Sequence, residues 1–460
     1  MSRVLLPILL LSVILYACQG SKPEEAKLLE SLERLPSLDV TEVETFSLAN
    51  DQILISEGSV SLKSIQLLQG FSSVIKIDDQ NFCLENPIAE KKYPFAIKQE
   101  FELEEMEVLR LLVLSQDKPG LTMLNFIKNV GNAPLNLSFQ FGAASELKPS
   151  MLMDSTYGVD GADQVIFDEL TGVITAKDAL NDWYATWASS ADYVLKPASI
   201  ACDAADSTLS KTSGFQVDLM LAPGQEQVVP VYLAGSDQSE LMAMETLAEL
   251  RTDLYSDWDQ SYALVDSLLS TSKVTLPSVE LQQAYLWSKF KAGVYQFPAE
   301  KKETAAIDPD QLLHFYEMNY KGFTASIDQT LFFTDLDQPR HLTPAFKYMQ
   351  PLVLSLMGIQ GDIVNRVTYV RPNLPTEWNE ASIENLWIDD NQLDIAITSE
   401  ENHLTVEITQ SQKKAGLSIE LPEAFMQVKV LGKEVSNDTK DGFRRILMTG
   451  DHVRIEASKK

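Results

Sequence analysis

The feature that most constrains the fold is a change of pattern past the middle of the chain, where β-type sequence gives way to helical periodicity. The helical segment lies between two proline-containing stretches, residues 276–281 and 371–378. Pro277 cannot lie inside a helix, whereas Ser278 can cap one. A helix is therefore expected over residues 279–297.

A second helix is expected over residues 343–357. Gly358 follows it, and glycine is a common residue just after the end of a helix. The apolar side chains fall nearly all round this helix, which predicts that it is buried; they are Ala345, Phe346, Met349, Leu352, Val353 and Leu356.

Short β-type runs broken by turn residues lie on both sides of this segment. Those within residues 38–235 predict a large antiparallel sandwich. After residue 382, period-two runs such as Leu393-x-Ile395-x-Ile397 and Leu404-x-Val406-x-Ile408 predict a small C-terminal sandwich. The expected fold class is therefore multidomain and mainly β with a central α region. The expected parts are a signal peptide (1–18), a linker (19–37), an N-terminal β-sandwich (38–235), a helical linker (236–275), a central helical region (276–378) and a C-terminal β-sandwich (379–460).

The first eighteen residues have the layout of a signal peptide. Arg3 precedes an apolar run that is too short to span a bilayer as a helix. Leu15-Tyr16-Ala17-Cys18 resembles a bacterial lipobox, in which the cysteine becomes diacylated and is the first mature residue; the alternative is a cleaved signal with an incidental cysteine. A lipobox implies a body anchored by lipid to a membrane of the bacterial cell envelope, at the cell surface or on the periplasmic face, with residues 19–37 as a solvated acidic linker.

Composition restricts the partners. A net charge of −29 repels nucleic acid and anionic headgroups, so a neutral ligand such as a glycan fits better. The alternative is that the acidity reflects only a saline habitat or solubility. Cys83 and Cys202 could form a disulfide or remain free thiols. The four histidines are scattered singly, so neither a metal site nor a cofactor is expected.

The stretches that flank the helical segment, together with Leu-Met-Gly-Ile-Gln-Gly-Asp (356–362), resemble the opening and closing motifs of the six-hairpin (α/α)6 toroid. This toroid occurs in glycoside hydrolases of the glycogen-debranching and trehalase-like group. The resemblance implies a large sandwich before the toroid and a small one after it. Residues 129–134, which predict a hairpin turn, and the acidic-x-x-Pro stretch 146–149 resemble the N-terminal sandwich of the same group.

The length available argues against a complete toroid. Twelve helices of about 11 residues with loops of about 4 need roughly 180 residues. The central region offers only about 100. A reduced, toroid-like helical segment is therefore expected.

The resemblance also implies where catalytic groups would lie. A carboxylate is expected where this chain has Ala325, and an amide where it has Leu342. Alanine can neither donate nor accept a proton, so both departures argue against turnover, and no catalytic carboxylate pair is assigned. The candidate glycan contacts in this region are Trp287, Asp308, Asp335 and His341.

Two further features have two interpretations each. Trp183 and Trp187 have the even spacing that places both on one face of a strand, either as a platform for sugar rings or as part of the sandwich core. The polar loop at residues 152–163 either lines a ligand cleft or is an ordinary surface loop.

The sequence thus predicts a lipid-anchored protein derived from a glycoside hydrolase, degenerate in catalysis, that binds or organises a glycan. The alternatives are an active exo-acting hydrolase of α-linked oligosaccharides and a deletion product without a function of its own. No protein partner is identified.

Overall fold

The structure is a computed structural model that describes residues 24–289 and 353–459, apart from residues 36–37, 40–46, 50–52, 57–58, 63–64, 116, 150–158, 199, 201–212, 279–281, 283–284, 287–288, 354–355, 376, 435–437 and 441. Several sequence predictions rest on residues outside this description, and they stay predictions. These residues are Cys18, Cys202, Trp287, Asp308, Ala325, Asp335, His341 and Leu342.

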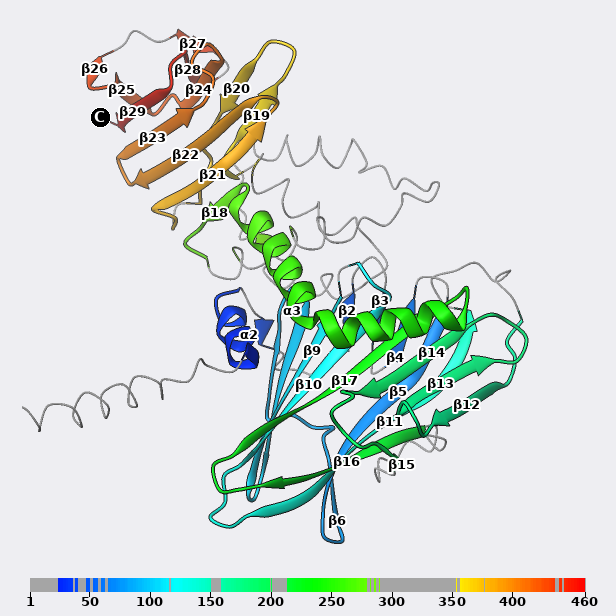
Figure 1. Cartoon of the computed structure of the whole chain (residues 1–460). Helices are drawn as coiled ribbons and strands as arrows, with labels where there is room; N and C mark the ends of the chain where they lie inside the picture. Colours follow the sequence, from blue (N-terminus) through cyan, green and yellow to red (C-terminus); the bar gives the residue numbers. More distant parts are fainter. Residues whose placement is uncertain are drawn as a thin grey trace, which may run out of the picture.

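Two large sheets pack face to face within residues 38–236 (Figure 1). Sheet A consists, in spatial order, of β1 (Leu38–Asp39), β7 (Ala89–Lys92), β8 (Ala96–Leu103), β9 (Met106–Leu114), β10 (Gly120–Asn129), β17 (Glu226–Ser236), β14 (Tyr184–Ser189), β13 (Val173–Asp178) and β12 (Asp163–Asp168). Sheet B consists of β15 (Lys196–Ala198), β16 (Ser213–Leu221), β11 (Leu135–Pro149), β5 (Ile65–Ile77), β4 (Ser59–Leu62), β3 (Ile53–Ser56) and β2 (Ser47–Ala49), with β6 (Gln80–Cys83) paired to β5.

The connection after β10 is a corner between the two sheets. β10 pairs with β9 and β17 in sheet A, whereas β11 pairs with β5 and β16 in sheet B. The buried Asn129 ties the corner together, because its Nδ2 donates to the carbonyl oxygens of Ala133 (2.8 Å) and of Leu221 (3.0 Å) on β16. The hairpin predicted at residues 129–134 is therefore wrong, since the chain changes sheets here.

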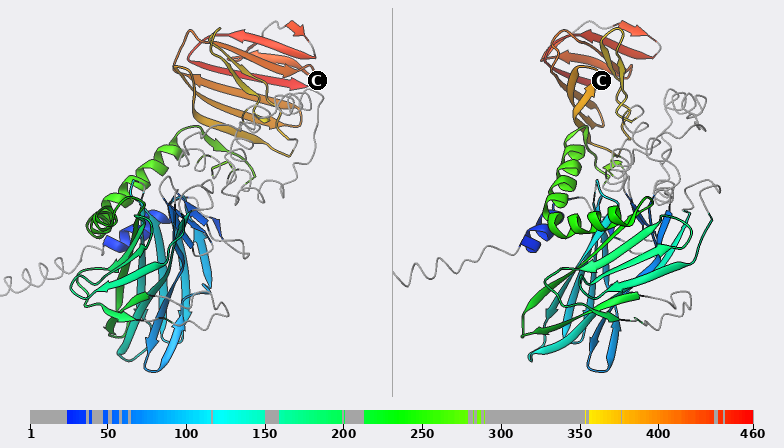
Figure 2. Two further views of the ribbon diagram at one scale, coloured as in Figure 1. Left: turned by 90° about the vertical axis from the view of Figure 1, so that its right-hand side faces the viewer. Right: turned by 45° about the vertical axis from the view of Figure 1, so that its right-hand side comes forward.

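Helix α2 (Glu24–Leu32) packs on the outer face of sheet A (Figures 1 and 2). Leu28 and Leu32, one turn apart, are buried in a cluster that includes Trp258. The indole Nε1 of Trp258 also donates to Ser31 Oγ at 3.0 Å. The prediction of a solvated linker is thus wrong for these residues, because the apolar stripe of the segment has a partner elsewhere in the chain.

Helix α3 (Glu240–Ser270) begins at the predicted place, with Ser239 as its N-cap. Figures 1 and 2 show that it bends near its middle. There Thr252 Oγ1 donates to the carbonyl oxygens of Ala248 (3.2 Å) and Glu249 (3.1 Å), a type of side-chain bond that bends helices. The first half of α3 packs on β14 and β17, and the second half joins the cluster beneath α2.

Two smaller sheets form the C-terminal module beyond α3 (Figure 1). Sheet C consists of β18 (Lys273–Thr275), β21 (Glu380–Ile388), β22 (Asn391–Glu400), β23 (His403–Gln410), β29 (His452–Lys459), β25 (Phe425–Val430) and β26 (Lys433–Glu434). Sheet D consists of β19 (Ile359–Asp362), β20 (Val367–Val370), β24 (Gly416–Pro422), β28 (Phe443–Met448) and β27 (Asp438–Lys440). The chain is therefore mainly β with a limited helical part, which confirms the predicted fold class.

The C-terminal module contains strands from both sides of the central region. β18 pairs with β21, and β20 pairs in parallel with β24. Leu276 and Met357 lie in the same buried cluster as Ile359 and Val370. The helical region was expected to continue to residue 378. The structure instead has strands over residues 359–362 and 367–370. The inner side chains of these strands fill this cluster.

Gly358 stands at the predicted end of the second helix, with φ +65°. A Cβ built there would lie 1.7 Å from the carbonyl oxygen of Arg371. Only glycine fits both this left-handed backbone and this close approach.

Cys83, at the end of β6, is disulfide-bonded, so it is not a free thiol. Its partner lies outside the described residues. A structural disulfide is typical of proteins in oxidising compartments.

A buried carboxylate holds sheet D together. Glu420 on β24 is 4% exposed and accepts hydrogen bonds from Nε of Arg371 (2.7 Å) and Nε of Arg445 on β28 (2.8 Å). Burial raises the pKa of Glu420, but the two guanidinium groups outweigh it, so the pKa lies below its usual value. The stabilisation is present above the pKa of an unfolded Glu and is lost as the pH falls through the folded value.

Replacing Glu420 by Gln should destabilise the protein by about 2 kcal/mol, because the partly exposed Arg371 and Arg445 lose their buried counter-charge. Urea unfolding at pH 7 measures the change, which should shrink as the pH is lowered toward 4. Glu407→Gln is the control, because Glu407 pairs with His452 at an exposed site and the change should cost about 1 kcal/mol or less. Equal effects of the two substitutions would contradict this account.

Candidate functional site

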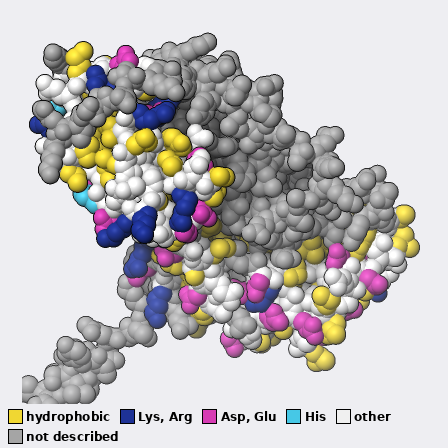
Figure 3. Space-filling model, turned by 90° about the horizontal axis from the view of Figure 1, so that it is seen from above, with side chains coloured by type: hydrophobic (Ala, Val, Ile, Leu, Met, Phe, Trp, Pro, Cys, Tyr) yellow, Lys and Arg dark blue, Asp and Glu magenta, His cyan; other side chains and the backbone are white. Residues whose placement is uncertain are grey.

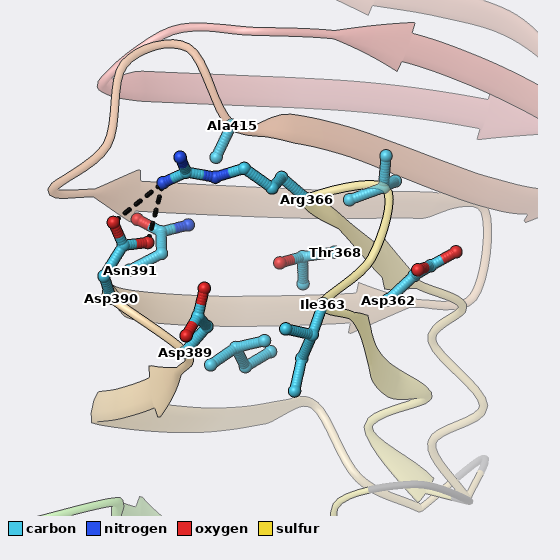
Figure 4. A pocket seen from close by; sticks show the side chains of 10 residues that line it. Asp362, Ile363, Arg366, Thr368, Asp389, Asp390, Asn391 and Ala415 are labelled. Carbon is cyan, nitrogen blue, oxygen red and sulfur yellow. Dashed lines mark hydrogen bonds and ion pairs between the residues drawn. The ribbon is translucent and has the colours of Figure 1, made fainter.

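A shallow pocket lies at the end of the C-terminal module, where the β21–β22 hairpin meets the β19–β20 connection (Figure 4). Its cavity volume is about 20 Å³, room for about one water molecule, so a larger ligand would lie over its open side. Polar and apolar side chains share the lining, which consists of Asp362, Ile363, Arg366, Val367, Thr368, Ile388, Asp389, Asp390, Asn391 and Ala415.

The hairpin turn supplies two of the acidic groups. Asp389 and Asp390 form the two-residue loop between the paired Ile388 and Asn391. Asp389 has φ +55°, the left-handed backbone that short hairpin loops require. Arg366 reaches across the pocket, and its Nη2 donates to both carboxylate oxygens of Asp390 at 2.7 and 2.8 Å (Figure 4).

The two remaining carboxylates of the pocket have different surroundings. Asp362 lies at the opposite end from the hairpin turn (Figure 4), and the side chain and backbone N–H of Asn365 donate to it at 2.7 and 2.9 Å. These bonds lower the pKa of Asp362. The carboxylate of Asp389 has no hydrogen bond or ion pair with any other side chain that the structure describes, so it can accept hydrogen bonds from a ligand.

This set of groups suits binding better than proton transfer. Glycoside hydrolysis requires one carboxyl group that stays protonated near neutral pH. The pKa of Asp362 is lowered, and Asp390 forms an ion pair with Arg366. The pocket therefore offers charged acceptors and one guanidinium beside the apolar Ile363 and Ile388, a combination that suits hydroxyl groups on a compact ligand.

An exposed tryptophan lies beside the pocket on the other face of the same hairpin. Trp387 is 54% exposed, and its Nε1 donates to Asn385 Oδ1 at 2.9 Å. Asn385 has φ +55° at a bulge in β21, and its Nδ2 donates to the carbonyl oxygen of Ser270 at 2.9 Å. Gln392 Nε2 donates to the same Asn385 oxygen at 2.8 Å. This network fixes the orientation of the indole. The ring is exposed to solvent, and its N–H group already donates a hydrogen bond to Asn385.

The tryptophans expected from the sequence lie elsewhere. Trp183 and Trp187 are 5% and 0% exposed and belong to the cluster between sheets A and B. The core interpretation is therefore confirmed, and the sugar platform is wrong for these two residues. Trp187 lies on β14, which is between β13 and β17 in sheet A, and Trp183 directly precedes that strand.

The polar loop at residues 152–163 is described only from residue 159 onward. Its last residue, Asp163, accepts a hydrogen bond from the Leu147 N–H at 3.0 Å. Burial raises the pKa of Asp163 more than this bond lowers it. The carboxylate thus ties the start of β12 to β11. The candidate contacts Trp287, Asp308, Asp335 and His341 lie outside the described residues, so they stay predictions.

Sequence reasoning missed Trp387, Asp389 and Arg366, although a signal existed for the first two. The alternation Leu386-x-Ile388 places Trp387 on the solvent face of its strand. The Asp-Asp pair between two alternating runs also indicates a short hairpin loop. No local pattern links Arg366 to them, because it comes from another sheet.

Charged side chains of both signs cover the part of the C-terminal module seen in Figure 3, whereas mainly acidic ones cover the visible face of the sandwich. No group of three His, Cys, Asp or Glu side chains within the described residues is placed to hold a metal ion. Of the helices that the structure describes, none is both long and apolar enough to cross a bilayer.

No family model and no curated protein matches the sequence. Among solved structures, a protein from the human microbiome described as a kojibiose phosphorylase is similar, with 8% identity and a TM-score of 0.46, over 90% of this chain and 92% of that one. A bacterial glucoamylase complexed with acarbose aligns at 9% identity and a TM-score of 0.32, over 54% of this chain and 42% of its own. A galactose mutarotase-like protein from Lactobacillus casei aligns at 8% identity and 0.27, over 42% and 100%. At these values the likenesses assign neither a family nor an activity.

Truncating the exposed and the buried tryptophan should lower the free energy of unfolding by very different amounts. Trp387→Ala should cost about 1 kcal/mol or less, because the ring is half in solvent. Trp187→Ala should cost about 3–5 kcal/mol, because it leaves a cavity in the core. Urea unfolding of both variants measures the difference, and a large loss from Trp387→Ala would mean that its ring is a packing element.

Proposed function

We propose that the chain is a lipid-anchored protein of the bacterial cell envelope that binds a neutral glycan without cleaving it. The observation that carries the proposal is the indole of Trp387, exposed and fixed in orientation beside a pocket with an unpaired carboxylate. The ligand class is suggested by the resemblance of the central region to sugar-cleaving enzymes.

The indole suits a sugar ring for physical reasons. The axial C–H groups of a pyranose form an apolar face that can lie on an aromatic ring. Because Asn385 already accepts the indole N–H bond, the ring loses no hydrogen bond when a sugar covers it. Where the glycan extends round the hairpin turn, the hydroxyl groups of a further sugar can donate to Asp389. The acidic side chains nearby disfavour anionic glycans, which leaves neutral ones.

Two sequence features support binding over turnover. Ala325 and Leu342 stand where the resemblance to six-hairpin hydrolases implies a carboxylate and an amide. In the pocket itself, the lowered pKa of Asp362 keeps that carboxyl group ionised at neutral pH, so it cannot serve as a general acid.

The lipobox-like sequence that ends at Cys18 supports the anchor. The disulfide at Cys83 agrees with a location outside the cytoplasm. Helix α2 begins six residues after Cys18, so the folded body would lie within about 20 Å of the lipid.

Isothermal titration calorimetry with maltotriose, kojibiose and trehalose tests the glycan. At least one sugar should release heat on binding without product formation. Trp387→Ala should weaken that binding about tenfold, and Asp389→Asn should weaken it by a smaller factor. Met426→Ala is the matched control, because Met426 is also 54% exposed and lies on β25 of the same sheet.

Two outcomes would overturn the proposal. Release of monosaccharide in the same incubations would show that the protein is a hydrolase. Equal affinity of the wild-type protein and the Trp387→Ala variant would move the glycan site away from this hairpin.

Replacing Cys18 by Ser should move the protein from the membrane fraction to the soluble fraction in a bacterial host. Fractionation followed by mass spectrometry of the N-terminal peptide measures the anchor directly. Cys83→Ser removes a different sulfur and should remain with the membrane. If Cys18→Ser also stays there, the anchor is not this cysteine.

A further inference from the structure

A row of polar side chains crosses the inner face of sheet A, in an otherwise apolar interior. The strand registers place Glu90 opposite Gln99, and Gln99 opposite Arg110. Arg110 in turn lies opposite Asn125 on β10. Leu112, two residues from Arg110, belongs to the cluster between the sheets, so the alternation of the strand directs Arg110 into the same interior. Arg110 is 5% exposed and Asn125 is 0% exposed.

One edge of the Arg110 guanidinium is bonded and the other is not. Nη1 donates to Gln99 Oε1 at 3.3 Å, and Gln99 Nε2 donates onward to Glu90 at 2.6 Å. The ring of Phe101 lies 5.0 Å from the guanidinium carbon. Nε and Nη2 are buried and make no hydrogen bond to any described part of the chain. These two N–H groups point the same way from one edge, which is the geometry that matches the two oxygens of a carboxylate.

Arg110 remains a cation at neutral pH. Burial lowers its pKa to about 10, and the nearby Glu85 and Glu90 oppose this change. Neither glutamate hydrogen-bonds to Arg110 within the described structure. Glu90 is linked to Arg110 only through the side chain of Gln99. A buried cation with unpaired donors is unfavourable, and an anion bonded to those donors would relieve the penalty.

Asn125 presents the complementary acceptor beside Arg110. Its Nδ2 donates to the carbonyl oxygen of Val229 at 3.1 Å, which fixes the orientation of the amide. Its Oδ1 is buried and has no donor among the described residues. Arg110 and Asn125 are opposite each other on antiparallel strands, so their Cβ atoms are about 5 Å apart and their polar groups face the same part of the interior. An oxygen acceptor repels a second carboxylate oxygen but binds a hydroxyl group.

We propose that Arg110 and Asn125 form a binding site for a small carboxylate with a hydroxyl group on the carbon next to the carboxyl carbon. The carboxylate accepts from Nε and Nη2 of Arg110, and the hydroxyl donates to Asn125 Oδ1. This site lies inside the N-terminal sandwich and does not depend on the glycan site at Trp387. Because it is buried, ligand entry requires a local opening of the strands, and binding should be slow.

The site is tested by calorimetry and by thermal unfolding of the full chain. Each is measured in sodium glycolate, sodium acetate and sodium chloride at equal ionic strength. Glycolate should bind and raise the unfolding temperature most, acetate less, and chloride not beyond the effect of ionic strength. Arg110→Lys keeps the charge but lacks the paired donors, so it should weaken glycolate binding at least tenfold. Asn125→Ala should reduce the affinity for glycolate to that for acetate.

Arg454→Lys is the control, because Arg454 on β29 is exposed, its Nε already donates to Glu456 at 3.0 Å, and it also pairs with Glu407. It should leave the response to glycolate unchanged. Equal responses to the three salts, or an unchanged glycolate response in Arg110→Lys, would overturn the proposal. If Arg110→Lys does not fold, the loss of preference for glycolate over acetate in Asn125→Ala decides the question.

Discussion

The arrangement of the N-terminal half depends on one constraint, the burial of sheet A on both of its faces. On β10, Met123 and Ile127 pack between the sheets, whereas Leu124 and Phe126 pack beneath the helices. A sheet with two apolar faces needs a layer on each side. Sheet B supplies one layer and helices α2 and α3 supply the other. This requirement explains why the acidic N-terminal segment is folded onto the body and why α3 bends to follow the sheet.

The sequence predicted those parts of the fold whose signal is local. The alternating runs after residue 382 and the helical pattern within residues 236–275 identify elements because neighbouring residues suffice to form them. The role of α2 was not predictable, because the partner of Leu28 and Leu32 is Trp258, more than 200 residues away. The turn at Asn129 has ordinary hairpin chemistry, and only the pairing of β11 with sheet B makes it a corner.

The candidate site was less accessible to prediction than the fold. Strand alternation predicts that Trp387 faces solvent. The network that fixes its ring, however, joins a bulge at Asn385 to the end of α3 at Ser270. The pocket likewise combines a hairpin of sheet C with Arg366 from the edge of sheet D. The unpaired edge of Arg110 has no sequence signal, because an arginine in a strand is ordinarily a surface residue. Each of these features arises from the meeting of distant segments.

The buried cluster shared by Leu276 and Met357 has a consequence for how such a chain can evolve. The polypeptide leaves the C-terminal module and returns to it at one anchoring point, so the intervening stretch is an insertion between two fixed ends. Each doubling of the length of a flexible insertion adds only about 0.6 kcal/mol of closure entropy. A change in the length of this stretch would therefore cost little while the flanking sheets keep their registers, which makes this junction a natural place for lineages to diverge in length.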